Sequence, residues 1–155
     1  MAFAEGTTVD VSKTRAEIES LARKHGASQF GSGWSSGGEA GITFVIKDRR
    51  VQFRLAMPTG QEKAIADKAR RMSRQNWGTP DAAKLRLCID AEERRLWRCL
   101  LLAIKAKLEI VASGIATFEE EFLAHVVTDN GLTVYERIRE GGMKMLTAAP
   151  EATNG

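Results

Sequence analysis

The longest unbroken helical pattern in this chain runs from Pro80 to Ser113. Thr79 suits the N-cap position, Pro80 the first helical position, and Gly114 the position just after the last turn. We therefore expect one long amphipathic helix with a single apolar stripe facing a core. The residues that follow the i, i+3, i+4, i+7 spacing of this stripe are Trp97, Leu100, Leu101, Ile104, Leu108 and Val111.

After Gly26 the apolar period changes from 3.6 to 2, which is the period of a strand with one buried face. Turn sequences at 36–38 (Ser-Gly-Gly) and 47–50 (Lys-Asp-Arg-Arg) divide this region into three segments. We expect a three-stranded antiparallel meander that ends at Pro58 and needs a helix to cover its apolar face. The polar face of the second and third strands carries Thr43, Lys47, Gln52 and Arg54.

The segments on either side of this core carry helix signals of their own. Thr14 and Glu17 match a capping box, which predicts a first helix from Arg15 to His25. Beyond the long helix, Thr117 with Glu120 forms a second predicted capping box, which opens a short helix. Thr133 with Glu136 forms a third, which starts a last helix that runs to Gly141. Phe118, Phe122 and Leu123 form the expected buried side of the first of these helices, and the Asp-Asn-Gly sequence at 129–131 predicts a turn.

These elements define an α+β fold in a single domain over residues 1–146. We expect residues 1–11 to form a loose arm and residues 147–155 to form a disordered tail. The connection at 58–79 is too long for a tight turn, and it contains a predicted helix from Gln61 to Gln75 with few apolar anchors. We expect this connection to be basic and mobile.

Charge is distributed unevenly along the chain. The net charge is +3, yet residues 47–98 carry 14 Lys and Arg against 7 Asp and Glu, whereas residues 99–155 carry 5 against 8. A concentrated basic region favours a polyanionic partner. The alternative is a solvated surface whose charges are balanced in space by the acidic C-terminal third. Trp77 directly follows the basic connection, where it either stacks on a base or packs as an anchor.

No motif in the sequence indicates catalysis. The two histidines lie far apart, and Cys88 and Cys99 fall on one helix about 16 Å from each other, too far for a disulfide. We expect no enzyme, cofactor or metal, although a carboxylate pair assembled in space from Asp48, Glu39 or Glu93 stays open. The glycines of the first strand match no phosphate-binding motif, which favours a pliable edge strand or a bulge.

Targeting signals are also missing from the sequence. No run of eighteen or more apolar residues occurs, and residues 1–12 lack the basic and apolar regions of a secretory signal. We therefore expect a cytoplasmic protein with no membrane partner.

Three segments together resemble a family of small, mostly uncharacterised proteins encoded by bacteriophages and prophages. They are GITFVIKDRRVQFRLAMP at 41–58, RLWRCLLLAIKAKLE at 95–109 and TFEEEFLAHV at 117–126. Separately, the order of helix, three-stranded meander and long helix over residues 15–113 is similar to the core of single-strand annealing proteins of the RecT and Red-beta kind. This second likeness is one of topology alone.

The likeness to annealing proteins implies a homo-oligomer that binds single-stranded DNA, or RNA, in a basic groove and promotes annealing in recombination. The implied phosphate contacts neutralise charge without reading sequence. The alternative is a protein–protein interaction module of phage origin that binds a host or virion protein. The implied nucleic-acid-binding residues are Lys47, Arg49, Arg50, Arg54, Arg70, Arg71, Arg74, Trp77, Arg94, Arg98 and Lys105.

Overall fold

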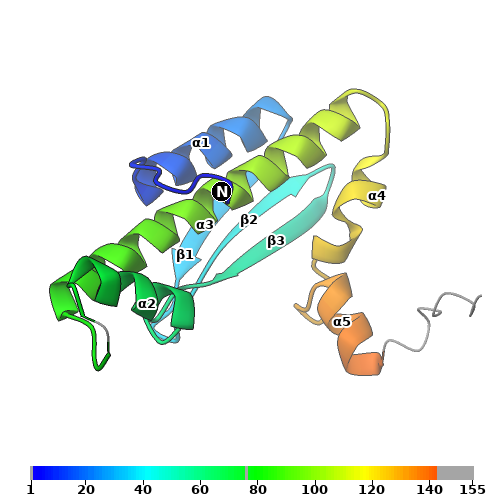
Figure 1. Cartoon of the computed structure of the whole chain (residues 1–155). Coiled ribbons are helices and arrows are strands. Elements are labelled where there is room, and N and C mark those ends of the chain that lie inside the picture. Colours follow the sequence, from blue (N-terminus) through cyan, green and yellow to red (C-terminus); the bar gives the residue numbers. More distant parts are fainter. Residues whose placement is uncertain (1, 76, 143–155) are drawn as a thin grey trace, which may run out of the picture.

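The computed structural model describes residues 2–75 and 77–142, and it confirms the α+β fold. Three strands form one antiparallel sheet in the order β1-β2-β3. Figure 1 shows the long helix α3 running diagonally across this sheet, with α1 beside it. The elements in chain order are α1 (Val11–Lys24), β1 (Gln29–Trp34), β2 (Glu39–Ile46), β3 (Arg49–Ala56), α2 (Lys63–Met72), α3 (Ala82–Ala112), α4 (Phe118–Phe122), the 3₁₀ turn η1 (Leu123–His125) and α5 (Val134–Gly141).

Helices α1 and α3 cover one face of the sheet, which is the predicted apolar face. Residues alternate along β2 between buried and partly exposed, because successive strand side chains point to opposite faces. The apolar stripe of α3 packs on the buried set, as expected from its spacing, and Ile18 and Ala22 of α1 complete the contact. The fully or almost fully buried members of this core on β2, β3 and α3 are Ala40, Ile42, Phe44, Ile46, Val51, Phe53, Trp97, Leu100, Ile104 and Leu108.

Two predicted helix starts are wrong. The N-cap of α3 is Asp81 and not Thr79, because the Asp81 carboxylate accepts a hydrogen bond from the Lys84 backbone N–H at 3.0 Å. Helix α1 begins at Val11 and not at the predicted Arg15. Val11 packs on the core, so the predicted arm at 1–11 is one residue too long. Thr14 is fully buried within α1, where its hydroxyl cannot cap the helix.

The β2–β3 turn is tighter than predicted. Only Lys47 and Asp48 form it, and both have positive φ, 49° and 61°. Two such residues are typical of the type I′ hairpin turn, whose twist matches that of the flanking strands. Arg49 and Arg50 consequently belong to β3. In β1, Trp34 pairs with Ala40 of β2 and so lies on the helix-covered face of the sheet, yet its side chain is 78% exposed.

The C-terminal elements close one edge of the sheet. Both predicted capping boxes form, at Thr117 and at Thr133. Val126 bridges to Val51, and the Val127 backbone N–H donates to the Arg50 carbonyl at 2.8 Å, so this segment covers the free edge of β3. Phe118 and Phe122 are buried as predicted, whereas Leu123 is 53% exposed because it faces away from the aromatic cluster in the 3₁₀ turn that follows α4.

The connection between sheet and long helix holds α2, which is shorter at both ends than the predicted helix. Ile65 and Ala69 are buried against Cys88 of α3 in a small apolar cluster separate from the main core. Ile65 and Ala69, two of the few apolar residues of this connection, therefore attach α2 to α3. Mobility of this connection stays a prediction, and the predicted tail at 147–155 lies outside the described residues.

Gly41 shows why one glycine of the sheet is required. A Cβ at this position would lie 2.8 Å from the Phe53 carbonyl oxygen, whereas a Cβ on Gly33 in the edge strand β1 would meet no atom within 4 Å. We expect Gly41→Ala to lower the free energy of unfolding by about 1–3 kcal/mol through this overlap. The control Gly33→Ala should leave stability unchanged or raise it by up to about 1 kcal/mol, because alanine restricts the unfolded chain. Urea unfolding measures both, and equal midpoints for the two variants would contradict the steric argument.

Candidate nucleic-acid interface

The predicted nucleic-acid-binding residues do not gather on one surface. The hairpin residues Lys47 and Arg50 lie at one end of β3, and α2 follows the other end (Figure 1). Six residue steps separate Arg50 from Ala56 at the other end of β3, which is about 20 Å along the strand. The basic residues of the hairpin and those of the connection therefore lie on different parts of the structure and do not form the predicted single groove.

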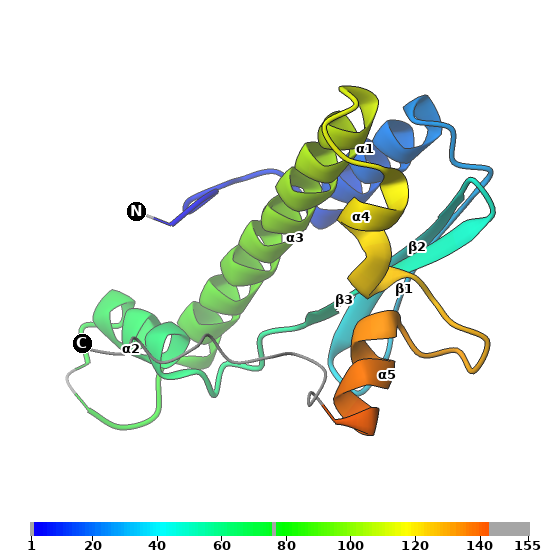
Figure 2. The ribbon, with the colours of Figure 1, turned by 90° about the vertical axis from the view of Figure 1, so that its right-hand side faces the viewer.

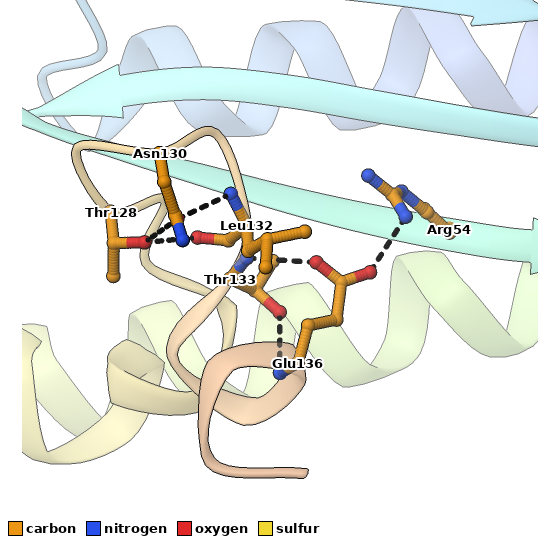
Figure 3. Close-up of polar contacts among 6 residues, drawn as sticks. All are labelled: Arg54, Thr128, Asn130, Leu132, Thr133 and Glu136. Atoms are coloured by element: carbon orange, nitrogen blue, oxygen red, sulfur yellow. Dashed lines mark hydrogen bonds and ion pairs between the residues drawn. The ribbon is translucent and has the colours of Figure 1, made fainter. Parts of the chain in front are cut away.

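Acidic residues of the C-terminal segment pair with two cations of the hairpin. Arg54 Nη1 lies 2.6 Å from Glu136 Oε1, and Arg49 Nε lies 3.8 Å from Glu119 Oε1. Glu136 also accepts the Thr133 backbone N–H at 2.8 Å, and these hydrogen bonds lower the pKa of Glu136 below its usual value. Arg54 consequently links β3 to the start of α5, as Figure 3 shows.

The loop before α5 is held by hydrogen bonds of its own, which position Glu136. The Thr128 hydroxyl donates to the Leu132 carbonyl at 2.7 Å, and the Leu132 backbone N–H donates to Asn130 Oδ1 at 3.2 Å (Figure 3). This loop contains the predicted Asp-Asn-Gly turn. These hydrogen bonds and the Thr133 capping box place Glu136 beside Arg54, so Arg54 binds within the protein.

The cations of the long helix also bind other parts of the protein. Arg98 Nη1 lies 2.8 Å from Glu17 Oε2 of α1, and Arg94 Nε donates to the Thr7 carbonyl of the N-terminal arm at 3.3 Å. Both side chains are partly buried, and their contacts tie α1 and the arm to α3. The ribbons of α1 and α3 lie side by side (Figure 2). Lys105 lies seven residues after Arg98 on α3 and is exposed.

The connection differs from both other groups because one short segment carries exposed cations and an exposed aromatic ring. Arg70 Nη1 donates to the Gly78 carbonyl at 3.2 Å, which holds the neighbouring Trp77 close to α2. The Trp77 side chain is 85% exposed, so it is no packing anchor. Within residues 2–75 and 77–142, no carboxylate lies within ion-pair distance of Lys68, Arg71 or Arg74. We call Lys68, Arg71, Arg74 and Trp77 the connector patch.

The acidic side chains near the connector patch already bind other groups of the protein. Asp67 binds Lys63 at 2.8 Å and also Arg70, and hydrogen bonds from these two cations lower the pKa of Asp67 to about 2. Glu62 accepts the backbone N–H of Thr59 at 3.0 Å, which lowers its pKa as well. Residues 58–84 contain six cationic and three acidic side chains, so this segment carries a net +3, equal to that of the whole chain.

A hollow of about 520 Å³ lies beside the patch, between the N-terminal arm, α2 and α3. Lys68 and Arg71 line it together with apolar side chains that include Ile65 and Leu96. Glu5, Glu62 and Glu92 line it too. Arg95 holds the Glu92 carboxylate at 2.6 Å, and this hydrogen bond lowers the pKa of Glu92, an effect to which the charge of Lys68 adds. Lys68 and this hollow were not predicted from the sequence, although the i, i+3 spacing of Lys68 and Arg71 on a predicted helix places both on one side.

The described part of the chain offers no other site with an obvious chemistry. Among residues 2–75 and 77–142, no three His, Cys, Asp or Glu side chains are grouped in a way that could bind a metal ion. Cys88 and Cys99 are both free thiols. In the same residues, every helix is too short or too polar to cross a bilayer.

No protein-family model matches this chain, and neither a curated protein nor a solved structure matches it. The likeness to phage-encoded proteins and to annealing proteins consequently stays a prediction from the sequence.

Proposed function

We propose that this protein binds single-stranded nucleic acid through the connector patch, as a non-enzymatic and sequence-tolerant binder. The observation that supports this most is Trp77, an 85% exposed indole next to Gly78, whose carbonyl Arg70 binds. The same connection carries Arg71 and Arg74, which have no ion-pair partner in the described chain. Exposing so large an apolar ring to water is unfavourable, and it suggests a ligand with a flat face of its own.

The chemistry of the patch favours single strands over duplexes. A tryptophan stacks on the face of a base, and base faces are accessible only where the strand is unpaired. Lys68, Arg71 and Arg74 would neutralise phosphates, which carry no sequence information. The hollow lined by Lys68 and Arg71 has apolar walls of a kind that suits a second base.

Strand annealing is part of the proposal. Stacking and phosphate contacts leave the Watson–Crick edges of the bases free, so that a bound strand can still pair with its complement. DNA is the proposed ligand, by analogy with the annealing proteins that the core topology resembles, and the proposed location is the cytoplasm.

The test is a titration of a labelled oligothymidylate with the purified chain at increasing salt. If three cations bind phosphates, a plot of log affinity against log salt concentration should have a slope of about −2, at about −0.7 for each contact with a single strand. Trp77→Ala should weaken binding by about 1–3 kcal/mol. The control Trp34→Ala removes another exposed tryptophan, which belongs to β1 and not to the connection, and should bind as the wild type does.

Salt-independent affinity, or equal affinity for a duplex of the same length, would rule the proposal out. The protein-interaction alternative predicts a different result: no oligonucleotide binds, and a pull-down from nuclease-treated lysate recovers one protein in stoichiometric amount.

A further inference from the structure

The outer edge of β1 presents unpaired backbone groups. The Ser35 backbone N–H donates to the Glu39 carbonyl at 2.8 Å, which marks this pair as hydrogen-bonded. Hydrogen-bonded pairs alternate along an antiparallel ladder, so the register assigns the next ones to Gly33 with Gly41 and Gly31 with Thr43. The N–H and C=O groups of the residues between them therefore point away from β2. These residues are Phe30, Ser32 and Trp34, and no hydrogen bond in the described chain reaches their outward groups.

The outer edge of β1 lacks the features that prevent a strand edge from pairing with another chain. Charged side chains, proline or a covering segment protect most edges from pairing with other chains. Strand β1 reads Gln-Phe-Gly-Ser-Gly-Trp, without charge or proline, whereas the edge of β3 is covered by Val126 and Val127. The exposed Trp34 ring lies at the end of the same open edge.

The sequence of β1 is symmetrical about Ser32. Aromatic residues stand two positions to either side, at Phe30 and Trp34, and glycines stand one position to either side, at Gly31 and Gly33. An interface around a two-fold axis pairs residue i with residue j and residue j with residue i. With the axis at Ser32, this pairing places each aromatic residue opposite an aromatic residue and each glycine opposite a glycine.

We infer that β1 pairs in antiparallel orientation with β1 of a second copy of this chain, around a two-fold axis at Ser32. In this register Ser32 faces Ser32 of the second copy, and Phe30 faces Trp34 of the second copy. All of these residues direct their backbone groups outward, so each pair exchanges two backbone hydrogen bonds. They also share one face of the sheet, so each exposed Trp34 packs on the Phe30 opposite it.

The flanking helix adds charge complementarity to this register. Arg15 of α1 lines a hollow with Trp34, and Glu19 lines another with Phe30. Placing Trp34 opposite Phe30 of the second copy brings Arg15 and Glu19 of the two chains to the same end of the contact. In the single chain, Glu19 binds Arg23 of the same helix at 2.6 Å.

The result is a continuous six-stranded sheet made from two three-stranded sheets, with the helices of both copies on one side. This inference depends on the backbone register and the pattern of β1 and is independent of nucleic-acid binding. A chain that binds no oligonucleotide can still form this dimer, so the two proposals can fail separately.

Sedimentation velocity over about a hundredfold range of protein concentration tests the dimer, because mass action makes its population concentration-dependent. We expect a monomer–dimer equilibrium for the wild type. Ser32→Lys should raise the dissociation constant about tenfold or more, since two like charges then face each other at the axis. The control Ser36→Lys makes the same charge change in the exposed β1–β2 turn and should dimerise normally.

A cysteine at the axis tests the register even if Ser32→Lys fails to fold. Cα atoms of a hydrogen-bonded pair lie about 5.5 Å apart, a distance that a disulfide can bridge. Ser32→Cys should therefore form a covalent dimer on mild oxidation, whereas Ser36→Cys and the wild type, with Cys88 and Cys99, should not. A wild type that stays monomeric at every concentration, or a dimer that Ser32→Cys does not crosslink, would overturn the inference.

Discussion

Reversing the charges of Arg71 and Arg74 is expected to lower the affinity for single-stranded DNA on the order of a hundredfold at low salt. The double variant Arg71→Glu, Arg74→Glu replaces two phosphate contacts of the connector patch with two repulsive charges. Both side chains are exposed and unpaired in the described chain, so the change should leave folding intact. The loss should shrink as salt rises, because both contacts are electrostatic and screened.

The hairpin supplies a matched control for this prediction. Lys47→Glu, Arg50→Glu makes the same change in net charge on exposed residues at the far end of β3. A titration of each variant with the same labelled oligonucleotide separates local contacts from overall charge. If both double variants lose affinity equally, binding follows net charge and the connector patch has no special role.

Replacing Trp97 is expected to give the largest loss of stability. Trp97 is 1% exposed, and its ring packs in the core where α1 and α3 meet the sheet, with Arg15 stacked at 5.7 Å from the ring centroid. Trp97→Ala should lower the free energy of unfolding by about 3–5 kcal/mol, because it removes buried apolar area and leaves a cavity. This is a large share of the stability of an ordinary domain.

The matched control is again another tryptophan. Trp77→Ala makes the identical chemical change at a side chain that is 85% exposed, and it should shift stability by no more than about 0.5 kcal/mol. Urea unfolding monitored by circular dichroism measures both variants without relying on tryptophan fluorescence. A similar midpoint for the two variants would mean that Trp97 is not central to the core.

Much of the fold could be predicted because local patterns determine local structure. The alternation of Ile42, Phe44 and Ile46 identified a strand and its buried face, and the stripe that begins at Trp97 identified the buried side of α3. The capping boxes at Thr117 and Thr133 were identified correctly for the same reason, since the atoms involved lie within one turn.

The same motif failed at Thr14 and Glu17, where only the tertiary structure could decide. Thr14 is fully buried, and Glu17 binds Arg98 of α3, 81 residues away, so neither side chain caps a helix. A motif defined by spacing cannot reveal that a neighbouring helix uses its residues.

The sequence by itself determined the elements, the positive charge of the central third and the symmetrical pattern of β1. The tertiary structure decided which cations are available to a ligand. Arg54 is neutralised by Glu136, 82 residues away, whereas Arg71 and Arg74 meet no carboxylate in the described chain. It also decided that β1 lies at an open edge while β3 is covered by Val127. The physical reason is that ion pairs and strand edges depend on distance in space, which packing sets between residues remote in the chain.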